Sequence, residues 1–183
     1  MPHRIKKMKK NMRPTITFLL VLMTVTAACQ SPNATPTLQP GEVEIPFETM
    51  VLDEEASAMN FEDMDTDPQV FAITTQDDIA EIESLITPES VDLLQEVDLN
   101  THSALVVFRG LQGCSGFGLA IERLRLQQDT LTIDVQFWQP PPNTACSNVV
   151  ISPYHIVRLD KSLISLDHVQ LALHSQVAER PRR

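Results

Sequence analysis

The stretch FGLAIERLRLQQDTLTIDVQFW, residues 117–138, decides the fold. In its second half, apolar residues at 131, 133, 135 and 137 alternate with polar ones, which is the period of a half-buried β-strand. In its first half, the apolar residues change from odd to even positions after Ile121, so one regular strand cannot turn them all inward. We therefore predict a β-bulge at Glu122–Arg123 and a hairpin turn at residues 127–130.

Further strands and two helices are predicted around this hairpin. The continuous apolar run at 104–108 is typical of a strand buried on both faces. Thr75 can cap a helix with Asp78 at its third position, and Pro88 can open a second short helix. Further strand patterns occur in four places, at residues 47–52, 70–74, 154–159 and 169–173. The predicted fold class is α+β, a single domain with a mainly antiparallel sheet curled around one or two short helices.

The first 28 residues have the pattern of a bacterial export signal. Six basic and no acidic residues precede an apolar run at 15–28, which as a helix spans only about 21 Å, against about 30 Å for a hydrocarbon core. Ala27 and Ala28 then lead into Cys29, which resembles a lipobox, although Thr26 departs from its usual aliphatic residue. A simple secretory signal is the alternative. We expect Cys29 to carry a lipid that anchors the protein outside the cytoplasm, in the bacterial cell envelope.

The mature chain divides into three predicted parts. Residues 29–46 contain four prolines and small polar residues, as in an extended tether. Residues 47–174 are expected to form the α+β domain, and the polar residues 175–183 a flexible tail.

The charge distribution excludes one class of partner. The chain has 14 Lys and Arg against 24 Asp and Glu; without the six basic residues of the leader, 8 remain against 24, a net charge of −16. No Lys or Arg occurs between Gln30 and Phe108. Such a surface repels nucleic acid, so no nucleic-acid partner is expected.

Cys114 and Cys146 are the two other cysteines of the chain. In an oxidising compartment a disulfide between them is the expected state. The alternative is that one of them is a nucleophile, with His155 as its base and Asp160 orienting the histidine. No spacing or motif favours that arrangement, and we predict no catalytic residue.

No metal or cofactor is predicted either. Asp63, Asp65 and Asp67 alternate as in a calcium loop, but Pro68 and Thr74 stand where that loop needs Gly and Glu. The glycine-rich turn at 113–118 lacks the lysine of a phosphate-binding loop.

Four short motifs carry a resemblance to a known family. They are Val97-Asp98-Leu99, ALVVFRG at 104–110, GCSGFG at 113–118 and SPYHIVRL at 152–159. Over about residues 97–161 the chain resembles the C-terminal domain of the PrcB family of protease-complex subunits. Phe117 stands where an aromatic hydroxyl is more usual, and the two cysteines are additional. The resemblance implies a small, non-catalytic, often lipid-anchored domain that supports a surface protease.

The predicted function is therefore that of a non-catalytic, protein-binding accessory subunit for a surface or secreted protease. The alternative is a small extracytoplasmic hydrolase or ligand-binding domain with a pocket that residue spacing does not reveal. Basic residues in the region 110–159 against an acidic preceding segment predict two faces of opposite sign, which can orient docking. The candidate partner contacts are Arg123, Arg125, Trp138, Tyr154 and Arg158.

Overall fold

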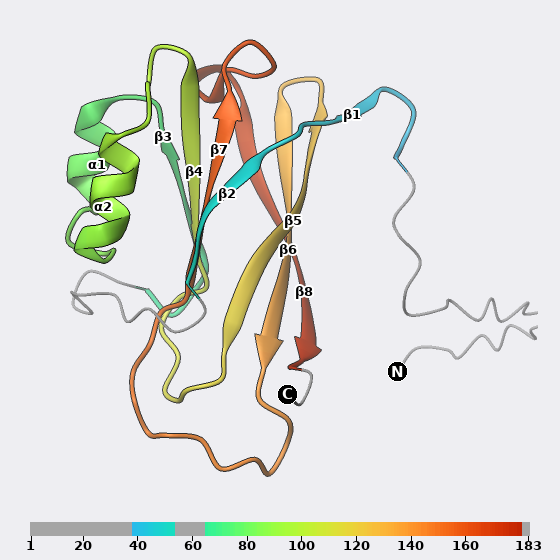
Figure 1. Ribbon diagram of the computed structural model, residues 1–183. Helices are drawn as coiled ribbons and strands as arrows, with labels where there is room; N and C mark the ends of the chain where they lie inside the picture. The colour runs from blue at the N-terminus through green and yellow to red at the C-terminus, as the bar shows by residue number, and fades with distance from the viewer. Residues whose placement is uncertain (1–37, 54–64, 181–183) are drawn as a thin grey trace, which may run out of the picture. The chain divides into compact units, whose positions relative to one another are not determined.

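The computed structural model describes residues 38–53 and 65–180 (Figure 1). The leader, Cys29 and the first half of the predicted tether, up to residue 37, lie outside these residues. Within the described ranges, no helix is both long and apolar enough to cross a membrane.

The described strands form two four-stranded sheets. Sheet A has the order β1-β5-β6-β8, and sheet B the order β2-β7-β4-β3. Neighbouring strands are antiparallel except β6 and β8, which are parallel. The strands of sheet A are β1 (Glu42–Glu44), β5 (Gly118–Gln127), β6 (Thr130–Gln139) and β8 (Gln170–Glu179). Those of sheet B are β2 (Glu48–Asp53), β3 (Gln69–Ile73), β4 (His102–Phe108) and β7 (Tyr154–Asp160).

The β5–β6 hairpin is confirmed together with its bulge. Ile121 pairs with Val135, but the next pair is Arg123 with Asp134, so Glu122 is the extra residue. The bulge lets β5 turn Leu119 and Ile121 inward before it and Leu124 after it. The change of hydrophobic period in the sequence therefore has a direct structural cause.

The main core lies between the two sheets. Leu105 and Val107 of β4 face sheet A, while Ala104, Val106 and Phe108 belong to a second core on the other side of sheet B. This placement explains the continuous apolar run, because neither face of β4 is exposed to solvent.

Two helices cover the outer face of sheet B (Figure 1). Helix α1 (Gln76–Ile82) begins with the predicted capping box, in which Thr75 Oγ1 accepts from the Asp78 N–H at 3.3 Å and the Asp78 carboxylate accepts from the Thr75 N–H at 2.8 Å. Helix α2 (Pro88–Gln95) has the proline in its first turn. A 3₁₀ turn, η1 (Leu166–His168), precedes β8.

The fold class is confirmed as α+β and mainly antiparallel, with two differences in detail. The strands form two packed sheets, and the helices lie outside one of them. The folded part also extends beyond the predicted limits of 47 and 174, because β1 pairs with β5 and β8 continues to Glu179. Backbone hydrogen bonds can hold an edge strand even when its side chains are polar. The sequence of β1 therefore looks like part of a tether, and the end of β8 looks like part of a flexible tail.

Candidate functional site

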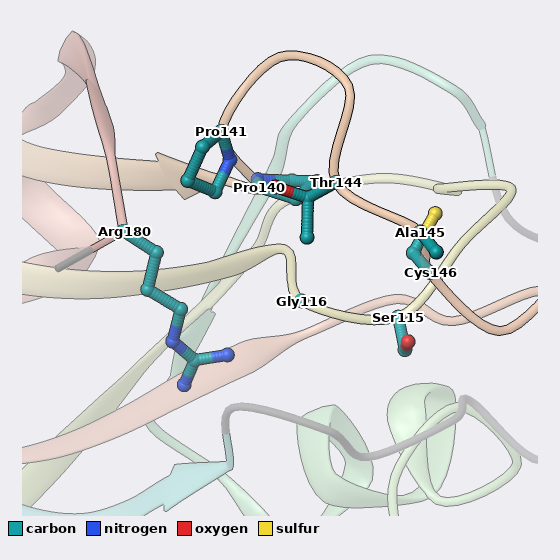
Figure 2. Close-up of a pocket in the computed structure, with 8 residues that line it drawn as sticks. All are labelled: Ser115, Gly116, Pro140, Pro141, Thr144, Ala145, Cys146 and Arg180. Carbon is teal, nitrogen blue, oxygen red and sulfur yellow. The ribbon is translucent and has the colours of Figure 1, made fainter. Parts of the chain in front are cut away.

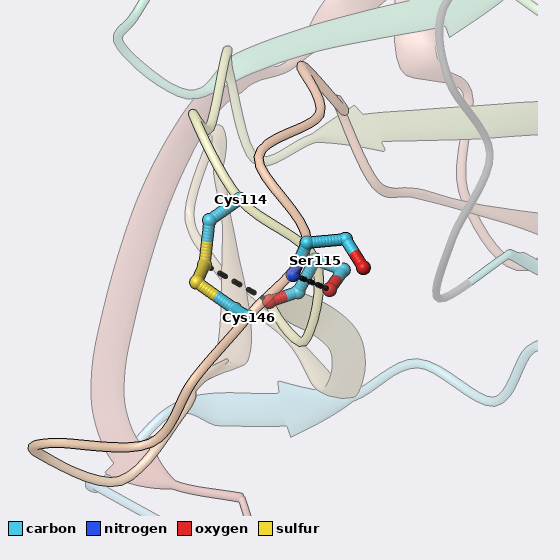
Figure 3. Close-up of a disulfide and its surroundings, with 4 residues drawn as sticks. Cys114, Ser115 and Cys146 are labelled. Atoms are coloured by element: carbon cyan, nitrogen blue, oxygen red, sulfur yellow. Dashed lines mark hydrogen bonds between the residues drawn. A yellow bond between two sulfur atoms is a disulfide. The ribbon is translucent and has the colours of Figure 1, made fainter.

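A disulfide joins the two long loops at one end of the sandwich. Cys114 and Cys146 are bonded with their Cα atoms 5.8 Å apart, as predicted (Figure 3). Ser115 N–H donates to the Ser147 carbonyl and Ser147 N–H to Ser115 Oγ, each at 3.1 Å. The exposed loop between β6 and β7 is thereby attached to the turn before β5. Since such bonds persist in oxidising compartments, the disulfide indicates an extracytoplasmic location.

A pocket of about 360 Å³ opens beside the disulfide (Figure 2). Gly116 lies on its wall with φ +93°, a backbone conformation that other residues adopt only with strain. Most of the lining is apolar, and Arg180 supplies the charged group. The lining residues are Ser115, Gly116, Pro140, Pro141, Thr144, Ala145, Cys146 and Arg180.

Arg109 is a buried cation that fastens sheet B to the β5–β6 hairpin. Its Nη1 donates to the carbonyls of Gly118, at 2.8 Å, and Trp138, at 2.6 Å. Its guanidinium lies between the rings of Phe117 and Phe137, 4.8 and 5.0 Å from their centroids. Burial lowers the pKa of Arg109 to about 10, so it stays charged at neutral pH. No pattern in the sequence indicates this role, because only the fold brings the two carbonyls and the two rings together.

His155 is buried between the sheets with both ring nitrogens engaged. Nδ1 accepts from the Ile121 N–H at 2.8 Å, and Nε2 lies 3.0 Å from Thr49 Oγ1. Because a backbone N–H can only donate, Nδ1 carries no proton, and the neutral ring donates from Nε2 to Thr49. Burial lowers the pKa of His155 to about 4.

The nucleophile–histidine–aspartate alternative is not assembled. Cys114 and Cys146 are both oxidised, which leaves neither as a thiolate. His155 bonds to Thr49 and Ile121 instead, and the exposed Asp160 accepts from the Ser162 N–H at 2.8 Å. His155 is also not among the residues that line the pocket beside Cys146.

An ion-pair network occupies the outer face of sheet A, the face turned away from sheet B. Asp134 accepts from Arg123 Nε at 3.2 Å, from Arg125 Nε at 2.5 Å and from His174 Nδ1 at 2.8 Å. Arg125 also pairs with Glu42 at 2.5 Å. Burial would raise the pKa of Asp134, but the hydrogen bonds from Arg125, His174 and Arg123 hold it below its usual value. The bulge places Arg123 on this face beside Asp134.

The candidate contact residues lie in three different places. Arg123, Arg125 and the half-buried Trp138 share the outer face of sheet A. Arg158 lies on β7 in sheet B. Tyr154 is fully buried against α2, where its hydroxyl lies 2.7 Å from Ser90 Oγ, so we omit it from any contact surface.

The basic side chains do not form a face of their own. Arg158 pairs with Glu48, and Lys161 Nζ donates to the Leu99 carbonyl at 2.7 Å. Glu42 and Glu48 both come from the acidic segment before residue 108. The expectation of two oppositely charged faces is therefore wrong in this region, because folding brings those acids onto the arginines.

The candidate calcium loop that begins at Asp63 is described only in part. Asp63 lies outside the described residues. Within residues 38–53 and 65–180, no group of three or more His, Cys, Asp or Glu side chains is arranged to hold a metal ion.

Together these features define a small extracytoplasmic α+β domain, with two packed sheets and a disulfide between its end loops. Residues 103–160 match the family model described as PrcB C-terminal, which confirms the resemblance for the segment from β4 to β7. That segment contains the hairpin, the disulfide, Arg109 and His155. No curated protein matches the chain, and no solved structure does.

Proposed function

We propose that the protein is a lipid-anchored, non-catalytic accessory subunit that binds and supports a surface or secreted protease. The observation that carries this proposal is the match of residues 103–160 to the PrcB C-terminal family. The resemblance to protease-complex subunits supplies the class of partner.

The roles of the reactive side chains support binding over catalysis. The two thiols form a disulfide, His155 links β7 to β2 and β5, and Arg109 links β4 to the hairpin. Each of these groups holds the fold together, and each has its polar contacts inside the domain.

The outer face of sheet A is the proposed contact surface. No described element packs over this face, whereas sheet B is covered by helices. Trp138 lies here next to the end that carries the disulfide loops, and tryptophan is enriched among residues that dominate binding energy. The surrounding polar network provides the hydrated rim of such an interface.

The contact is tested by co-purification from detergent-solubilised membranes. We expect Trp138→Ser to reduce the protease that co-purifies at least tenfold, because a tryptophan that anchors an interface contributes about 2 kcal/mol or more. Leu93→Ser is the matched control, since Leu93 is 40% exposed on α2, on the helical side of the domain.

Two results would contradict this surface: wild type that captures no protein, or equal loss in both variants. Arg123 is unsuitable for the test. A carboxylate at that position would face Asp134 and disturb the fold itself.

The anchor is tested separately. We expect Cys29→Ser to abolish fatty-acid labelling and to release the protein from the membrane fraction or leave it unprocessed. Two or three acyl chains at about 0.8 kcal/mol per buried CH₂ would otherwise hold it permanently. Ser31→Ala is the control that keeps the cysteine. Unchanged labelling of the Cys29→Ser variant would refute the lipid anchor.

A further inference from the structure

Strand β8 is a long edge strand whose second edge has no partner in the described parts of the chain. Its ten residues pair with β6 in unbroken register, from Thr130 with Gln170 to Gln139 with Glu179. β8 stands at the end of the strand order of sheet A (Figure 1). The other edge strands are shorter, with three residues in β1, six in β2 and five in β3.

The backbone groups that face the free edge follow from the pairing with β6. Gln170 N–H donates to the Asp129 carbonyl at 2.7 Å, and Arg180 N–H to the Gln139 carbonyl at 2.9 Å. Even-numbered residues of β8 therefore bond to β6. Because strand residues alternate, the N–H and C=O groups of the odd-numbered residues point to the free edge. These residues are Leu171, Leu173, Ser175, Val177 and Glu179.

β8 also lacks the features that protect exposed edges from pairing. It contains no lysine, no proline and no bulge, and Glu179 is its single acidic residue. Val177, on the face directed toward sheet B, is 58% exposed. The acidic residues of α1 and α2 lie in the layer that packs on the far face of sheet B, away from this edge.

We propose that β8 pairs antiparallel with β8 of a second copy about a twofold axis at Ser175, which joins the two A sheets into one. In this register Ser175 lies opposite Ser175, Leu173 opposite Val177, and Leu171 opposite Glu179. All of these pairs belong to the edge-facing set, so about ten backbone hydrogen bonds form across the axis.

The side chains favour this register, and they favour a second copy of β8 as the partner strand. The exposed Val177 of each copy is covered by Leu173 of the other, and no two like charges lie directly opposite. A register shifted by one residue at the axis would place two His174 rings face to face. The strand is thus complementary to itself, and the inference does not depend on a protease partner.

The first test measures mass. The full chain, extracted in detergent, should have twice the chain mass by light scattering during size-exclusion chromatography at about 50 µM protein. Val177→Lys should weaken the dimer at least tenfold, because it places a charge opposite Leu173. Gln127→Lys is the matched control, since it adds the same charge to an exposed position of sheet A on β5.

The second test measures register. Ser175→Cys should form a disulfide-linked dimer under mild oxidation, because opposite residues of a hydrogen-bonded pair have Cα atoms about 5.5 Å apart. Gln176→Cys should not, because its copies lie diagonally, about 7–8 Å apart. Both variants keep the same native cysteines.

Three results would overturn the proposal: a monomeric wild type, a dimer that Val177→Lys leaves intact, or equal cross-linking of the two cysteine variants. A monomeric wild type from which Val177→Lys removes a different bound protein would likewise exclude self-pairing. It would assign the edge to that protein instead.

Discussion

Replacing Cys114 and Cys146 together with serine should lower the free energy of unfolding by about 3–4 kcal/mol. The disulfide spans 32 positions, and a closed loop of that size restricts the unfolded chain by this amount in the chain-entropy model. The effect should be seen in denaturant unfolding of wild type and variant under the same non-reducing conditions. The loop between β6 and β7 should also become more sensitive to protease, since few other bonds attach it.

Ser115→Ala separates the covalent bond from the hydrogen bonds beside it. That variant removes one hydrogen bond, from Ser147 N–H to Ser115 Oγ, and should cost about 1 kcal/mol. A double-serine variant as stable as wild type would contradict the structural role of the disulfide. Two free thiols in protein taken from the cell envelope would contradict its formation.

Acidification below neutral pH should destabilise the fold through His155. In the folded chain burial lowers the pKa of His155 to about 4, against 6.5 for the free side chain. Between these values the unfolded chain binds a proton that the folded chain does not, so stability falls as the pH falls. The loss reaches about 3 kcal/mol near pH 4 and levels off below that pH.

The measurement is urea unfolding at a series of pH values from 7 to 4. His155→Gln should be less stable at neutral pH but should lose most of this pH dependence, because glutamine does not titrate. His168→Gln is the control at an exposed position and should keep the full slope. Asp134, whose pKa is lowered by its hydrogen bonds, acts in a separate and more acidic window. If the free energy of unfolding depended on pH equally in wild type and His155→Gln, the titration of His155 could not be the cause.

Much of the local structure could be predicted from the sequence. The Glu122 bulge follows from a change of period within ten residues, and the start of α1 follows from Thr75 and Asp78, three residues apart. The Cys114–Cys146 bond was predictable because the export signal implies an oxidising compartment and two cysteines remain. In each case the interacting residues are close in the chain or are the sole candidates of their type.

The candidate site was less predictable. The position of Trp138 on the polar side of β6 follows from alternation along one strand. The burial of Tyr154 could not be predicted in this way, because its partner Ser90 lies on α2, 64 residues away. The structural roles of Arg109 and His155 could not be predicted, because their hydrogen-bond partners lie on other strands.

The sequence by itself determined seven of the eight described strands, both helix starts, the hairpin and the disulfide, because period, caps and cysteine count are local or exclusive properties. Only the tertiary structure decided the division into two sheets, the parallel position of β8 and the extent of the edges. It also decided that Glu42 and Glu48 neutralise arginines far along the chain. The physical reason is that every residue except proline offers the same backbone N–H and C=O groups, so these groups do not specify which strands pair. The pairing depends instead on how the side chains of the whole core pack together.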